Sequence, residues 1–99
     1  MTKQRRAYCR KLVLAHLVAS DRHDLRSLED ATGMPRRTLQ DTLADLGDIG
    51  IACQFVQDGP KNNHGFYRIS DWGDHDPGWI ALNLPRLRAE FEAGDLRPA

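Results

Sequence analysis

The sequence predicts a mainly helical α+β protein in which one two-stranded hairpin lies between helices. Apolar residues recur with a helical period through residues 3–46, and the period changes to two after Gly50. A turn-rich segment separates two runs of period two, and a helical period resumes in the tail. A chain of 99 residues builds a single core. We therefore expect one domain over residues 1–99, with a core at 1–70 and a C-terminal helical extension at 71–99.

The first helix is predicted over Lys3–Ala19, on a stripe spaced i, i+4, i+7 and i+11. That stripe consists of Tyr8, Leu12, Ala15 and Ala19. Basic residues cluster in the first half of this helix, namely Arg5, Arg6, Arg10 and Lys11. Positive charge near a helix N-terminus opposes the macrodipole, so local helix stability does not explain their placement.

The segment Ser20–Arg26 reads as a polar turn, in which Asp24–Arg26 could pair as a short edge strand. A second helix is expected to begin at Ser27, which forms a weak capping box with Asp30. Gly33 ends it, and Pro35 favours the first position of a third helix. That helix is predicted over Arg36–Leu46, with a buried stripe of Leu39, Leu43 and Leu46.

Two strands follow, predicted at Ile51–Val56 and Phe66–Ser70, with Asp58–Gly65 as the turn between them. The tail has a helical stripe of Ile80, Leu84, Leu87 and Phe91. Pro77 follows an Asp76 cap at its start, and Pro85 predicts either a kink or two short helices.

This order of elements resembles that of bacterial winged helix-turn-helix regulators. The segments that carry the resemblance are LEDATGMPRRTLQDTLADLGDIGIACQF and QDGPKNNHGFYRIS, and about 70 residues are covered. The tail YRISDWGDHDPGWIALNL resembles a small proteobacterial family of winged-helix proteins. The resemblance implies a winged helix-turn-helix with a two-stranded wing, sequence-specific binding of double-stranded DNA and regulation of transcription. Such domains usually carry Ser or Thr where this chain has Pro35, so the third helix would keep free N–H groups for a phosphate.

The third helix would then enter the major groove and contact bases. The predicted base contacts are Arg36, Arg37, Thr38, Gln40 and Asp41. Arginine suits the O6 and N7 atoms of guanine, and glutamine suits adenine. Asp41 would repel phosphates, but it could accept a hydrogen bond from cytosine or hold Arg37. Alternatively, Arg36 and Arg37 form a solvated helix start.

Contacts with the DNA backbone are predicted from the hairpin tip and the first helix. These residues are Lys61, Asn62, Asn63, His64, Arg5, Arg6 and Arg10. The alternatives are an ordinary turn and a solvated basic helix face.

Fourteen basic and fourteen acidic residues give a net charge of zero, which seldom marks a nucleic-acid binder. Residues 1–40, however, hold nine basic and four acidic residues, which is +5, and the remainder is −5. The acidic half, Asp71–Asp76 in particular, favours a competing function, a winged-helix module that binds protein and not DNA.

The residues do not predict an enzyme, a cofactor, a metal or a small-molecule effector. The four histidines lack metal-ligand spacing with Cys9 and Cys53, and the cluster around His75 lacks the glycine and glutamate of a calcium loop. No phosphate loop or nucleophile elbow occurs. Two cysteines without a C-x-x-C motif predict buried thiols in a reducing compartment. The apolar run LVLAHLVAS is too short for a membrane span and lacks a cleavage site, so we expect a cytoplasmic protein.

Trp72 and Trp79 are expected to anchor the tail. The tail stripe of Ile80, Leu84, Leu87 and Phe91 is broad for so small a body, which predicts a homodimer interface. Its two reading helices would meet half-sites about one helical turn apart. Alternatively, the stripe packs wholly within its own chain.

Overall fold

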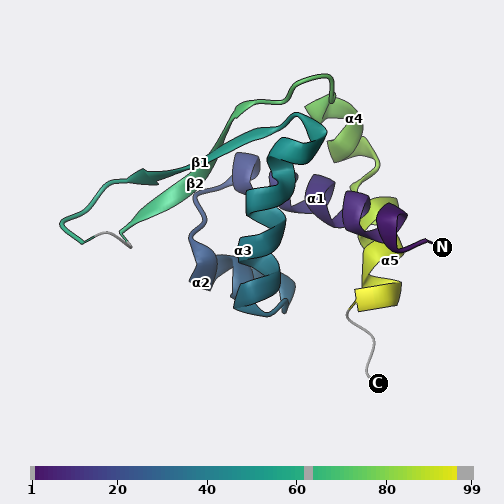
Figure 1. Cartoon of the computed structure of the whole chain (residues 1–99), viewed down its shortest axis with the longest axis horizontal. Helices are drawn as coiled ribbons and strands as arrows, with labels where there is room; N and C mark the ends of the chain where they lie inside the picture. Colours follow the sequence, from purple (N-terminus) through teal and green to yellow (C-terminus); the bar gives the residue numbers. More distant parts are fainter. Residues whose placement is uncertain (1, 62–63, 96–99) are drawn as a thin grey trace.

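The computed structural model describes residues 2–61 and 64–95, with side chains given up to residue 90. Its elements in chain order are α1 (Lys3–Ser20), α2 (Leu25–Thr32), α3 (Arg36–Ala44), the 3-10 helix η1 (Asp45–Ile49), β1 (Ala52–Gln57), β2 (Gly65–Asp71), α4 (Pro77–Leu82) and α5 (Leu84–Asp95). The hairpin β1–β2 projects from one end of the molecule, α4 and α5 lie at the other end, and α3 lies between them (Figure 1). The predicted mainly helical α+β fold is confirmed.

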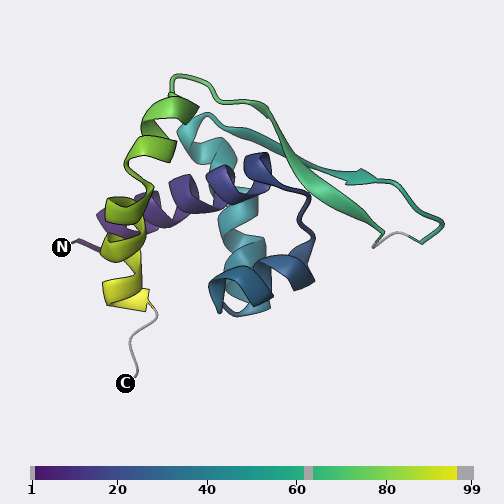
Figure 2. The same ribbon diagram turned by 180° about the vertical axis from the view of Figure 1, so that it is seen from behind.

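The core is built around α1, which packs against α3, α4, α5 and β2 (Figure 2). Six of its residues are buried, namely Cys9, Leu12, Val13, Leu14, Ala15 and Val18. Each buried large aliphatic side chain contributes about 1.5–3 kcal/mol relative to exposure. Of the predicted stripe, Leu12 and Ala15 are buried and Tyr8 is half-buried, but Ala19 is exposed in the last turn.

The second helix begins earlier than predicted, because its N-cap is Asp24 and not Ser27. The Ser27 N–H donates to the Asp24 carboxylate at 2.8 Å, and the Ser27 hydroxyl accepts from the Asp24 N–H at 3.0 Å. This is a complete capping box, and the Ser27 backbone hydrogen bond lowers the pKa of Asp24. The segment before α2 pairs with the hairpin at His23, where the Tyr67 N–H donates to the His23 carbonyl. This pairing lies one residue before the edge strand predicted at Asp24–Arg26.

The turn between α2 and α3 follows the predicted chemistry. Gly33 ends α2 in the left-handed region, with φ 73°. Pro35 is the N-cap of α3, one residue before the predicted position, and α3 has no side-chain cap. The three leucines Leu39, Leu43 and Leu46 are buried. The α-helix ends before Leu46, however, because the chain tightens into η1 at Asp45.

The hairpin is antiparallel, and Phe55 lies opposite Tyr67 and Cys53 opposite Ile69. Each strand deviates from its predicted bounds by one residue at its ends. The exit of β2 passes close to the entry of β1, where a Cβ atom on Gly73 would collide with the Gly50 carbonyl. Gly73 also has φ 62°, so this crossing requires glycine.

The tail forms two helices separated at Asn83, the second of the two predicted forms. Asp76 caps α4 by accepting from the Gly78 N–H at 2.9 Å, and Pro77 occupies the first turn. No helix in the described part of the chain is long and apolar enough to cross a membrane.

The tail stripe packs into the protein's own core, which contradicts its assignment to a dimer interface. Ile80 and Leu87 are 1% and 0% exposed, and Leu84 is half-buried against the same core. The side chain of Phe91 lies outside the described residues. The stripe is broad because α1 covers it along much of α5.

A polar contact reinforces the packing of α5 on α1. The Cys9 thiol donates to the Glu90 carboxylate at 2.8 Å, and Arg5 pairs with the same carboxylate at 3.2 Å. Burial and the Glu90 hydrogen bond raise the pKa of Cys9 to about 11. Cys9 is buried as predicted, Cys53 is half-buried, and both are free thiols.

Candidate nucleic-acid interface

The exposed face of α3 holds four of the five predicted base-contact residues. Burial of Leu39 and Leu43 on one side turns the other side outward, and the residues there are Arg36, Arg37, Gln40 and Asp41. Thr38 is half-buried, and it lines a depression beside α1.

The two arginines at the start of α3 differ in their surroundings. Arg36 pairs with Glu29 of α2 at 2.9 Å, and its side chain is 54% exposed. The Arg37 side chain is 89% exposed, and its Nε lies 3.9 Å from the Asp41 carboxylate. Exposed ion pairs contribute at most about 1 kcal/mol. Arg37 is the more available of the two for a ligand, because its side chain is more exposed and its pair is longer.

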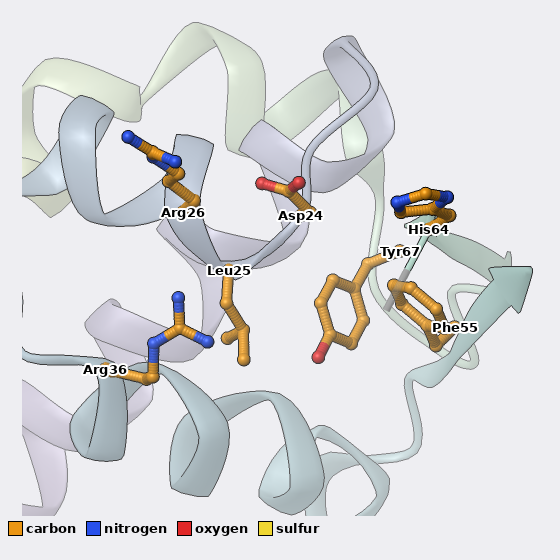
Figure 3. A pocket seen from close by; sticks show the side chains of 7 residues that line it. All are labelled: Asp24, Leu25, Arg26, Arg36, Phe55, His64 and Tyr67. Atoms are coloured by element: carbon orange, nitrogen blue, oxygen red, sulfur yellow. The ribbon is translucent and has the colours of Figure 1, made fainter. Parts of the chain in front are cut away.

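A groove of about 490 Å³ separates the start of α3 from the hairpin. Its lining residues are Asp24, Leu25, Arg26, Arg36, Phe55, His64 and Tyr67. Figure 3 shows Arg36 on one side and the rings of Phe55 and Tyr67 on the other. These rings meet edge to face with centroids 5.1 Å apart. The groove therefore has an apolar aromatic wall opposite arginine side chains.

Tyr67 is the less exposed of the two rings in the aromatic wall. Burial raises the pKa of its phenol above the ordinary 10.0, and the phenol hydroxyl can donate a hydrogen bond. Phe55 is 38% exposed, which leaves part of its ring open to the groove.

Arg22 contacts both strands of the hairpin through Phe66 and Asp58. Its guanidinium lies 3.9 Å from the centroid of Phe66 and pairs with Asp58. At the tip, the His64 N–H donates to the Lys61 carbonyl at 3.0 Å, and both side chains are exposed. The predicted contacts Asn62 and Asn63 lie outside the described residues.

The basic residues of α1 divide between two sides of the helix. Arg5, a predicted backbone contact, pairs with Glu90 of α5 and lies over the Tyr8 ring, so it lies on the side of α1 that faces α5. Arg10 and Lys11 line the depression beside α3, together with Asp41. Arg6 is half-buried, one turn before Arg10.

Charge along α3 and η1 is polarised. The N-terminal end carries Arg36 and Arg37, whereas Asp41, Asp45 and Asp48 are exposed farther along. The macrodipole of α3 adds partial positive charge at the arginine end, and that end lacks a side-chain cap. An anion is therefore attracted to the start of α3 and repelled from η1.

Sequence reasoning missed Glu29, Arg26, Phe55 and Tyr67 at this site. Phe55 and Tyr67 could have been found, since cross-strand partners share one face of a hairpin. The Glu29–Arg36 pair depends on the angle between α2 and α3, which has no local signal in the sequence.

The acidic turn before α4 makes one local hydrogen bond and one polar contact with α1. Asp71 accepts from the Gly73 N–H, and His75 Nε2 lies 3.0 Å from the Tyr8 hydroxyl. Within residues 2–61 and 64–95, no three His, Cys, Asp or Glu side chains are grouped so as to hold a metal ion.

Comparison with known proteins agrees with this architecture. A family model described as winged helix-turn helix matches residues 3–91. The chain belongs to this family. The winged-helix assignment confirms the resemblance that the third helix and the hairpin carry in the sequence.

A solved structure with the same fold is that of a DUF2131 family protein from Shewanella amazonensis. It is 47% identical, with a TM-score of 0.85 over 92% of this chain and 88% of that chain. No curated protein matches this winged-helix chain. Membership of the winged-helix family suggests DNA binding.

Proposed function

We propose that this winged-helix protein binds double-stranded DNA sequence-specifically and regulates transcription. The observation that carries the proposal is the exposed pair Arg36 and Arg37 at the uncapped start of α3, beside the groove against the wing. In this proposal α3 enters the major groove, where Arg37 reads guanine and Gln40 reads adenine. Arg36 reads a base or, held by Glu29, a phosphate at the groove wall.

The polarity of α3 supports entry by its N-terminal end. Asp41, Asp45 and Asp48 would lie against phosphates if the helix lay flat along the groove. Entry by the arginine end moves the acidic end away from the backbone and presents the uncapped N–H groups to it. Asp41 then orients Arg37 or accepts from a cytosine, and Thr38 contacts the DNA only at its exposed edge.

The groove between α3 and the wing suits the sugar-phosphate strand between a major and a minor groove. Arg26 and His64 supply donors for phosphates, and the exposed part of Phe55 suits a deoxyribose. Lys61 at the tip, with its neighbours Asn62 and Asn63, contacts the backbone farther along. Arg6, Arg10 and Lys11 contact phosphates on the other flank of α3.

The proposal describes a cytoplasmic binding protein without catalysis, cofactor or effector, two copies of which act at adjacent half-sites. The alternative is a winged-helix module that binds protein. The exposed acidic residues of α3 and η1 favour it, because they lie on the surface that would face DNA.

Selection from random duplexes, followed by titration of the selected site at several salt concentrations, tests the proposal. We expect Arg37→Ala to lower the affinity for the selected site by about 10-fold or more and to relax preference at one base pair. Arg68→Ala is the matched control, because Arg68 alternates with Tyr67 along β2 and lies on the other face of the wing. A DNA binder loses affinity log-linearly as salt rises. Absence of binding even at low salt would favour the protein-binding alternative.

A further inference from the structure

The groove between α3 and the wing has an aromatic wall whose rings are held in place. Phe55 and Tyr67 lie opposite each other across the hairpin and meet edge to face, with centroids 5.1 Å apart. The Tyr67 N–H donates to the His23 carbonyl at 2.8 Å. The Phe55 ring lies against Gly65, where an added Cβ atom would come within 2.9 Å of the ring's Cζ atom. Phe55 is nevertheless 38% exposed, so the wall presents aromatic surface that the fold positions but leaves partly uncovered.

The side of the groove opposite these rings is formed by an apolar residue and two arginines. Leu25 packs against the core, and Figure 3 shows it between Arg36 and Tyr67. Arg26 and Arg36 come from α2 and α3, on the side away from the rings. The guanidinium group is planar and stacks on flat aromatic rings. A flat ring in the groove would therefore have stacking partners on both sides.

The charged groups at the groove balance one another. Arg26 and Arg36 contribute two positive charges. The carboxylate of Asp24 lines the same groove, and that of Glu29 pairs with Arg36 at 2.9 Å. The interior therefore suits an uncharged ring with polar edges better than an anion. A phosphate is better placed at the rim, where Arg26 and His64 are exposed.

Polar groups beside the aromatic wall match the edge of a nucleobase. The Tyr67 hydroxyl can donate a hydrogen bond, and the carboxylate of the half-buried Asp24 can accept one from an amino group. A nucleobase combines such donors and acceptors with two flat aromatic faces. The groove volume of about 490 Å³ lies within the range of about 300–1,000 Å³ that is usual for ligand pockets. We propose that the groove takes an unpaired base of bound DNA, stacked on the exposed ring of Phe55.

The proposed path of the DNA supplies this base, so the inference rests on the proposed function. In that function the sugar-phosphate strand follows the rim of the groove, past Arg26 and His64. A base on that strand is held beside the groove at high effective concentration, which a free nucleoside lacks. A paired base must first leave its partner, whereas an unpaired base has no partner to lose. We therefore expect tighter binding to DNA that contains an unpaired base than to fully paired DNA.

Three duplexes of the same sequence test this preference. The first is fully paired, and the second carries one extra adenine without a partner, placed at successive positions along the selected site. The third carries a deoxyribose without a base at the same position, which keeps the local flexibility of the DNA but removes the stacking face. In fluorescence anisotropy titrations at low salt, we expect the extra adenine at its best position to raise the affinity by about 10-fold. The residue without a base should lose most of that gain.

The ratio of the affinities for the second and first duplexes is the quantity compared among variants. Phe55→Leu keeps an apolar side chain but removes the aromatic face, so the ratio should fall towards one. Phe55→Tyr keeps that face and should keep the ratio. Gln54→Leu is the matched control, because it places the same leucine one position earlier, on the other face of β1, and should leave the ratio unchanged. Circular dichroism checks that the variants keep the secondary structure of the wild type.

The possible outcomes separate this inference from the proposed function. Equal affinities for the three duplexes would overturn the inference and leave the proposed function standing. An equal gain with and without the extra base would assign the preference to DNA flexibility, which also overturns it. Phe55-dependent binding of free deoxyadenosine, without any gain from the extra base, would assign the groove to a free ligand and overturn it as well. Absence of binding to any duplex would overturn the proposed function and this inference together.

Discussion

The Arg36 guanidinium lies 2.9 Å from the Glu29 carboxylate, so the first residue of α3 is tied to the helix before it. This ion pair spans the turn at Gly33 and Pro35 and joins the two helices of the helix-turn-helix. It holds Arg36 at the groove facing the wing, while Arg37 extends into solvent. The two adjacent arginines are therefore positioned differently, Arg36 beside the groove and Arg37 in solvent.

Removing the Glu29 charge is expected to strengthen DNA binding. Glu29→Gln releases Arg36 and removes a negative charge beside a residue proposed to contact DNA. The affinity for DNA should therefore rise several-fold at low salt. The stability change should stay below about 1 kcal/mol, because the pair is exposed. Titration with the selected duplex and urea unfolding measure the two effects. Asp30→Asn removes the same charge from an exposed neighbouring position, and an equal gain there would show that the Arg36 contact is irrelevant.

Substitution at the wing tip should affect all DNA sequences alike. Lys61→Ala removes one exposed cation, so affinity for selected and scrambled duplexes should fall by the same factor. The slope of log affinity against log salt should decrease by about one. Fluorescence anisotropy over a salt series provides both quantities. A loss confined to the selected sequence would instead place Lys61 at a base.

The capping box of α2 predicts a pH-dependent contribution to stability. Asp24→Ala should cost about 1 kcal/mol at neutral pH, the usual value of an N-cap. The pKa of Asp24 is lowered in the folded state from its ordinary 3.8, chiefly by the Ser27 N–H. The stabilisation is therefore present above that ordinary value and is lost as the pH falls through the folded pKa. Urea unfolding at several pH values should show the wild type and Asp24→Ala converging in acid, and a constant difference would contradict this assignment.

Both thiols should resist alkylation in the folded protein. Burial raises the pKa of Cys53, and burial with the Glu90 hydrogen bond raises that of Cys9, each from 9.0 to about 11. At pH 8 the reactive thiolate is then about 100-fold rarer than in the unfolded chain. Mass spectrometry after timed iodoacetamide treatment, with and without urea, measures the difference. Equal rates of modification in the two conditions would show that neither thiol is protected.

Local patterns in the sequence predicted most of the fold. Leu39, Leu43 and Leu46 showed which side of the third helix is buried, and therefore which side carries Arg37 and Gln40. Gly33 marked the end of α2 correctly, and Pro85 marked the interruption of the tail. These features depend on residues within a few positions of one another, so periodicity and backbone preference suffice to find them.

The start of α2 shows where local reasoning failed. Ser27 and Asp24 are both good N-cap residues, and either could begin a helix. The backbone bridge between His23 and Tyr67 holds the preceding chain extended, which leaves Asp24 at the cap. The decisive partner is far along the chain, so the sequence around the helix could not choose between the two residues.

The sequence by itself determined that the tail has an apolar stripe, that α1 carries a basic half and that α3 begins with two exposed arginines. Only the tertiary structure decided that α1 covers Ile80 and Leu87, that Arg5 turns to Glu90, and that Arg36 and Phe55 face each other across a groove. Helical periodicity specifies which side of an element is apolar. The partner of that side depends on packing between segments that are distant in the chain, and burial of apolar area is non-directional.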